Sequence, residues 1–76
     1  MKYKYRFKIV AEPQWLIASN TKMQELDFDL QCVIENYIEF LCDRDDLTTE
    51  IFWPIMERVF EEGGGKLYHI DGGRIS

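Results

Sequence analysis

The fold is decided first by residues 2–10, which read KYKYRFKIV. Aromatic and β-branched residues alternate strictly with cations in this stretch, and a period of two is that of a strand with one buried face. Aromatic and β-branched side chains on one face suit a sheet that packs on helices. The other face carries the cations Lys2, Lys4, Arg6 and Lys8. We therefore expect a strand with a core face and a basic face.

Two short segments follow the break at Pro13. Residues 15–19 form an apolar run that we interpret as a second strand, and one helical turn opened by Pro13 is the alternative. Residues 20–26 are polar, and Thr21 with Gln24 has the spacing of a capping box. This spacing predicts a short turn of helix.

Residues 29–42 are interpreted as the first amphipathic helix. On a wheel of 100° per residue, the apolar side chains fall within an arc of roughly 160° and the polar ones occupy the rest. The apolar set is Leu30, Val33, Ile34, Tyr37, Ile38, Phe40 and Leu41. Asp27 or Asp29 can cap the N-terminus of such a helix. The acids of residues 29–42 then face outward, and a charged loop follows at residues 43–46.

A second helix is predicted at residues 49–62. Thr48 and Thr49 are both good N-caps, and three glycines follow the helix and end it. Pro54 lies inside the pattern, where it removes one amide donor, so we expect a kink there or a helix that begins only near Trp53.

The C-terminal segment is predicted to contain the last strand. Residues 66–70 have a strand pattern. Asp71-Gly72-Gly73 is typical of a tight turn, which could reverse the chain so that residues 74–76 run back along the strand. The predicted order is ββααβ. We expect an α+β fold, with a small, mainly antiparallel sheet packed on two amphipathic helices in one domain over residues 1–76.

The charges are distributed unevenly along the chain. The net charge is −5, yet residues 1–8 hold four cations and no acid, whereas residues 25–62 hold twelve acids against Arg44 and Arg58. Such a field favours encounter with a basic surface and opposes direct binding of nucleic acid. Charged helix exteriors that serve solubility are the alternative. A nucleic-acid stacking platform on the first strand is disfavoured, because the alternation puts its aromatics and cations on opposite faces.

Motifs for phosphate, calcium or other metal sites are incomplete. Residues 63–66 read GGGK, but a phosphate-binding loop needs glycine and Ser or Thr where Phe60 and Leu67 stand, and it joins a strand to a helix. A calcium loop beginning at Asp43 needs glycine and glutamate where Thr48 and Pro54 stand. We expect no cofactor and no metal.

The single histidine has no set of catalytic partner residues that the sequence places beside it. His69 precedes Asp71 by two residues, so a carboxylate could orient it as a general base, but the sequence places no nucleophile beside it. A histidine that forms ordinary hydrogen bonds at a sheet edge is the favoured interpretation. We therefore predict that the protein is not an enzyme.

Cysteine spacing and hydropathy bear on the cellular compartment. Cys32 and Cys42 would lie about 15 Å apart along the predicted helix, too far for a disulfide. No apolar run approaches the ~20 residues that span a bilayer, so no membrane association is expected. These features favour a reducing, cytoplasmic setting.

The leading hypothesis is a non-enzymatic protein-binding module that presents an acidic helical surface to a basic site and so acts as a DNA mimic. The partner would be a nucleic-acid-handling protein, and an inhibitor such as a phage anti-defence (anti-CRISPR) protein or an immunity protein fits this description. The predicted contact residues are Glu35, Glu39, Asp43, Asp45 and Asp46.

The alternative hypothesis is a self-associating structural or regulatory subunit, for example a homodimer. It rests on apolar residues that the predicted patterns leave without a place in the core, because exposed apolar patches commonly mark interfaces. These residues are Trp15, Phe28, Cys32 and Trp53.

Overall fold

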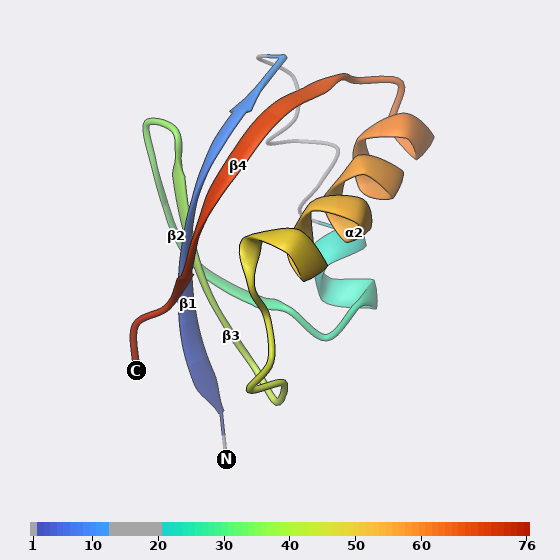
Figure 1. The fold of residues 1–76 in the computed structure, drawn as a ribbon. Helices are drawn as coiled ribbons and strands as arrows, with labels where there is room; N and C mark the ends of the chain where they lie inside the picture. Colours follow the sequence, from blue (N-terminus) through green and yellow to red (C-terminus); the bar gives the residue numbers. More distant parts are fainter. Residues whose placement is uncertain (1, 13–20) are drawn as a thin grey trace.

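A computed structural model describes residues 2–12 and 21–76 of the chain, and it shows an α+β arrangement (Figure 1). Its elements in chain order are β1 (Tyr3–Ala11), β2 (Asp29–Ile34), β3 (Tyr37–Cys42), α2 (Thr49–Glu62) and β4 (Leu67–Arg74). A helical turn at residues 21–25 precedes β2, as the capping-box spacing predicted. The strand predicted at residues 15–19 lies outside the described residues.

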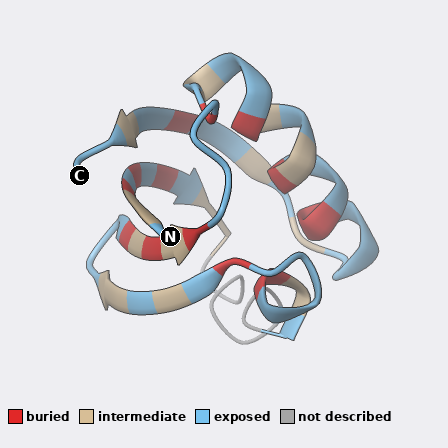
Figure 2. Cartoon of the chain, turned by 90° about the horizontal axis from the view of Figure 1, so that it is seen from below, coloured by how far each residue is buried: buried red, intermediate tan, exposed pale blue. Residues whose placement is uncertain are grey.

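The four strands form one antiparallel sheet in the order β2-β3-β1-β4. The predicted N-terminal strand is confirmed as β1, which is central and pairs with β3 and β4. Helix α2 and the helical turn at residues 21–25 lie on one side of the sheet (Figure 1). Buried residues gather between the sheet and α2 (Figure 2), while the opposite sheet face is open to solvent. The element order therefore differs from ββααβ, although the α+β class is confirmed.

The predicted helix at residues 29–42 is wrong, because this stretch forms the hairpin β2–β3. Glu35 and Asn36 make the turn, Glu35 has a φ of 55°, and Ile34 pairs with Tyr37 across it. The stretch is rich in β-branched and aromatic residues, which suit a pleated sheet. Along β3, Ile38, Phe40 and Cys42 are buried against the core while the residues between them point to the open face. The helix wheel was misleading because apolar residues occupy both faces of this hairpin.

Helix α2 agrees with the prediction over its whole length. The Thr48 side chain accepts a hydrogen bond from the Ile51 amide at 3.3 Å, which fixes the N-terminus. Pro54 lies inside the helix at an exposed position, and the helix begins at Thr49, ahead of Trp53. The buried side of α2 consists of Phe52, Met56, Val59 and Phe60.

Strand β4 is longer than predicted, and the turn expected at Asp71-Gly72-Gly73 is wrong. The strand continues through both glycines to Arg74 along one edge of the sheet. Gly72 allows this, because a Cβ atom built there would lie 2.2 Å from the carbonyl oxygen of Arg6. The Thr49 hydroxyl donates to the Gly72 carbonyl at 3.1 Å and accepts from the Gly72 amide at 3.2 Å. The start of α2 is thereby tied to the edge strand.

Aromatic rings form the centre of the core. Phe7 and Phe52 stack with ring centroids 4.3 Å apart, and Phe40 lies 5.2 Å from Phe52. Phe28, which precedes β2, contacts Phe40 and Phe52 at 5.1 and 5.8 Å. These rings join the sheet, the segment before β2 and α2 into one packed unit. None of the helices in the described ranges is both long and apolar enough to cross a membrane.

Candidate functional site

Acidic side chains gather on the solvent side of α2 and in the loop before it. Glu50, Glu57 and Glu61 are spaced by seven and four residues, which puts them on one exposed side of the helix over about 16 Å. The loop at residues 43–48 leads directly into α2 and is rich in exposed acids. We call this set the acidic face. Its members are Asp43, Asp45, Asp46, Glu50, Glu57 and Glu61.

Most carboxylates of the acidic face have no cationic partner within the described part of the chain. The exception is Asp46, whose two carboxylate oxygens accept hydrogen bonds from Arg44 at 3.0 and 3.1 Å. Arg44 lowers the pKa of Asp46 mainly through these hydrogen bonds. The remaining acids keep their charge uncompensated, so this side of the molecule has a negative field.

The structure separates the five contact residues predicted from the sequence. Asp43, Asp45 and Asp46 belong to the acidic face. Glu35 lies in the β2–β3 turn, at the other end of β3, roughly 20 Å away for a six-residue strand. Glu39 lies in β3 and points to the open face of the sheet. The predicted alignment of Glu35 and Glu39 with the loop acids is wrong, because it required a helix where the chain forms a hairpin.

Glu39 is also compensated by cations of the adjacent strand. Arg6 donates to Glu39 Oε1 from Nε at 2.8 Å and from Nη2 at 2.6 Å, and Lys4 Nζ lies 3.4 Å from Oε2. The hydrogen bonds from Arg6 are the main reason why the pKa of Glu39 is below its usual value. Two cations share this one acid, so Glu39 offers little negative charge to a partner.

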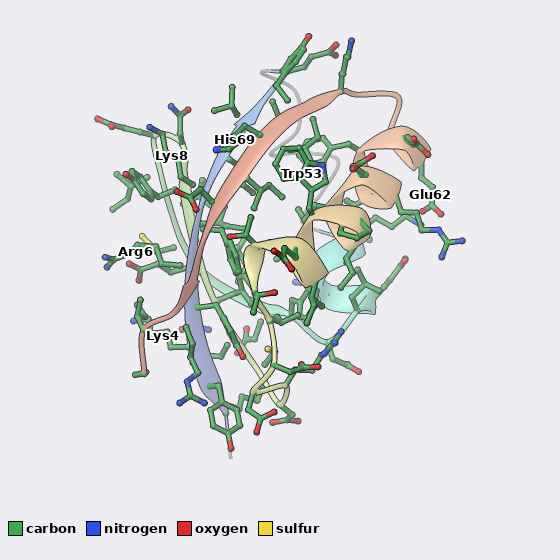
Figure 3. All side chains as sticks on the ribbon, viewed as in Figure 1. Lys4, Arg6, Lys8, Trp53, Glu62 and His69 are labelled. Carbon is green, nitrogen blue, oxygen red and sulfur yellow. The ribbon has the colours of Figure 1, made fainter. Side chains whose placement is uncertain are left out.

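The open face of the sheet carries the predicted basic row together with apolar side chains that the sequence analysis did not place there. Lys4, Arg6 and Lys8 project from β1 away from α2 (Figure 3), next to Glu39 and Tyr37 of β3. A shallow groove of about 290 Å³ lies on this face. Its lining residues are Arg6, Cys32, Ile34, Tyr37 and Glu39. The alternation in residues 2–10 indicated the basic row, but only the register of β1 and β3 brings it beside apolar side chains.

The buried Tyr5 hydroxyl anchors the acidic loop to the core. It donates to the Arg44 carbonyl at 2.6 Å and accepts a long hydrogen bond from the Leu47 amide at 3.4 Å. Leu47 is itself buried, so the loop is fixed at two neighbouring points. Burial raises the pKa of the Tyr5 hydroxyl. Tyr5 therefore holds the loop acids in place while it packs in the core.

We expect Tyr5→Phe to lower the free energy of unfolding by about 1–2 kcal/mol at neutral pH, because the buried Leu47 amide loses its acceptor and the Arg44 carbonyl loses a donor. The folded pKa of Tyr5 lies above the unfolded value of 10.0, so the neutral hydroxyl stabilises the protein below pH 10. That contribution is lost as pH rises through the folded pKa. Urea unfolding at pH 8 and pH 11 should show the difference between wild type and variant shrinking. A difference that grows with pH would contradict this role.

The residues considered for catalysis or metal binding are dispersed. His69 is exposed on β4, where its ring centroid lies 5.5 Å from that of Trp53. Cys32 and Cys42 are free thiols on opposite faces of the sheet, and Cys42 is buried. Burial raises the pKa of the Cys42 thiol. Within the ranges that the structure describes, no three His, Cys, Asp or Glu side chains are grouped so as to hold a metal ion.

The apolar residues that suggested self-association have different positions. Phe28 is 3% exposed and belongs to the core, which removes it from any interface. Trp53 packs against the core and His69, Cys32 is half-buried on the open face, and Trp15 lies outside the described residues. No family model, no curated protein and no solved structure matches this chain.

Proposed function

We propose that the protein is a non-enzymatic binding module whose acidic face occupies a basic site on another protein. The observation that carries this proposal is the contrast in ion pairing between the two sides of the molecule. On the sheet, Lys2 pairs with Asp29 at 3.9 Å, while Lys4 and Arg6 share Glu39. On the acidic face, Glu50, Glu57 and Glu61 have no such partner among the described residues. The uncompensated charge therefore favours a cationic partner.

The partner class follows from the charge and its arrangement. A groove lined with Lys and Arg for nucleic-acid phosphates attracts a row of exposed carboxylates on a rigid helix. Occupation of that groove would inhibit a nucleic-acid-handling protein, so the chain would act as a DNA mimic. A phage anti-defence protein, of which an anti-CRISPR protein is one type, and an immunity protein both fit this role. A cytoplasmic location belongs to the same proposal, since such partners work there and both cysteines are free.

Two double variants with the same change in net charge test the acidic face. Glu57→Gln/Glu61→Gln removes two carboxylates from the acidic face. Glu12→Gln/Asp71→Asn removes two carboxylates elsewhere, since Glu12 directly follows β1 and Asp71 lies in β4. We expect the first pair to weaken binding of the captured partner roughly tenfold or more, because complementary charges are lost at the contact. The second pair should change affinity about twofold at most, through net charge alone.

The measurement is capture of the partner from host lysate, followed by titration of the purified complex at several salt concentrations. A basic partner whose affinity falls steeply with salt agrees with the proposal. Equal effects of the two double variants, or an affinity that salt does not change, would rule out recognition by the acidic face.

A further inference from the structure

The open sheet face exposes apolar side chains on a surface that is otherwise charged. Ile34 is 63% exposed and Tyr37 is 42% exposed, and they pair with each other across the end of the β2–β3 hairpin. Cys32 is half-buried beside them, and Leu41 is half-buried on the same face, about 13 Å further along β3. Helix α2 covers the other face of the sheet and cannot shield these side chains. The groove described above therefore has an apolar edge that a partner could cover.

The charges on this face balance, unlike those of the acidic face. The cations Lys2, Lys4, Arg6 and Lys8 share this face with the acids Asp29, Glu39 and Asp71 of the neighbouring strands, and a fourth acid, Glu35, lies in the turn at its end. The whole chain carries −5, so two copies repel each other unless they meet through a locally neutral surface. The open sheet face is such a surface, and the acidic face is not.

We propose that two copies of this chain associate through their open sheet faces and form a symmetric dimer. A two-fold axis running along β3 would bring Tyr37 and Leu41 of one copy against the same residues of the other. It would also lay β2 over β1 of the second copy, which places Asp29 opposite Lys4 and the aliphatic Ile34 over the stem of Lys8. Glu39 tolerates this arrangement because Arg6 and Lys4 of its own chain compensate it. Along the axis, apolar contacts at Tyr37 and Leu41 therefore flank the compensated Glu39, and complementary charges lie toward the rim.

Analytical ultracentrifugation over a concentration series tests the dimer. The mass of the wild type should rise from 9.1 kDa toward twice that value as concentration increases to roughly 1 mM. Tyr37→Glu should weaken association at least tenfold, because the proposed two-fold axis puts the two introduced carboxylates opposite each other. Ile51→Glu adds the same charge on α2, at a position 37% exposed, and should leave association unchanged. A wild-type mass that stays at 9.1 kDa, or equal effects of the two variants, would overturn the proposal.

Nuclear magnetic resonance identifies the face and separates this dimer from the acidic-face complex. On dilution, amide shifts should change along β1, β2 and β3 and stay constant in α2; changes centred on α2 would overturn the proposed geometry. Raised salt should leave the dimer largely intact, because its apolar contacts are not screened and Glu39 is compensated within its own chain, whereas raised salt should dissociate a complex held by the acidic face. Each proposal can therefore fail without the other.

Discussion

Replacing Phe52 with Ala is expected to lower the free energy of unfolding by about 3–5 kcal/mol, the usual cost of removing a buried aromatic ring. Phe52 is fully buried, and its ring lies within 6 Å of those of Phe7, Phe28 and Phe40. The variant removes the ring through which α2 contacts the aromatic residues of β1 and β3. Small domains have total stabilities of about 5–15 kcal/mol, so this loss should leave the fold marginal.

Ile51→Ala on the same helix is the control for Phe52→Ala, because Ile51 is 37% exposed and lies outside the core cluster. Its cost should be below about 1 kcal/mol. Phe52→Leu should fall between the two, since it keeps part of the buried volume. Urea unfolding followed by circular dichroism measures all three. A Phe52→Ala protein no less stable than Ile51→Ala would show that the aromatic cluster does not hold α2 on the sheet.

Gly72→Ala is expected to cost about 2–4 kcal/mol, combining backbone strain with a steric clash. The added Cβ atom would lie 2.2 Å from the Arg6 carbonyl oxygen and 2.8 Å from Phe7 Cα. Gly72 also has a φ of 155°, which residues with a side chain rarely adopt. Relief of the clash would push β4 away from β1 and disturb the paired hydrogen bonds between Gly72 and Thr49.

Gly73→Ala is the matched control, because no atom lies within 4 Å of a Cβ atom built at Gly73. The same chemical change one residue later should alter stability by less than about 1 kcal/mol, since loss of glycine also restricts the unfolded chain. Chemical denaturation of the two variants in parallel gives the comparison. Equal stabilities would mean that β1 and β4 can separate at Gly72 without cost.

The sequence predicts β1 and α2 correctly because each of these segments shows only one hydrophobic periodicity. In β1, aromatic residues point to the core and cations point to solvent, so the period of two is unbroken. In α2, the Thr48 cap and the buried residues Phe52 and Met56 agree with a period of 3.6. Local chemistry and tertiary packing favour the same structure in both elements, and both predictions were confirmed.

The hairpin was mispredicted because its two faces are both partly apolar. Tyr37 and Leu41 on the open face break the alternation that would have marked β3, and together with Ile38 and Phe40 they fill one arc of a helix wheel. Only the pairing with β1 decides in favour of a strand. The same limit applies to the surfaces, because the contact of Glu39 with Arg6 depends on strand register over 33 positions.

The turn predicted at Asp71-Gly72-Gly73 is a different case. These residue types favour a turn, but tertiary packing keeps them in strand β4. Glycine is common in turns because it adopts unusual backbone angles, but the same lack of a Cβ atom lets two strands approach closely. At Gly72 both properties are used inside a strand, since the Arg6 carbonyl occupies the space of a side chain and φ is 155°. Sequence alone does not distinguish these two uses.

The position of β1 in the sheet has a consequence for how the protein folds. β1 occupies residues 3–11, but its two neighbours are residues 37–42 and 67–74, so the middle of the sheet is closed by segments distant in the chain. Folds with many such distant contacts acquire their structure slowly, because long loops must close before pairing stabilises them. Until β4 docks, β1 presents an unpaired edge with Tyr5, Phe7 and Ile9 on one side, which is the kind of surface that recruits strands from other chains. The interval before β4 docks is therefore when intermolecular strand pairing competes most directly with folding.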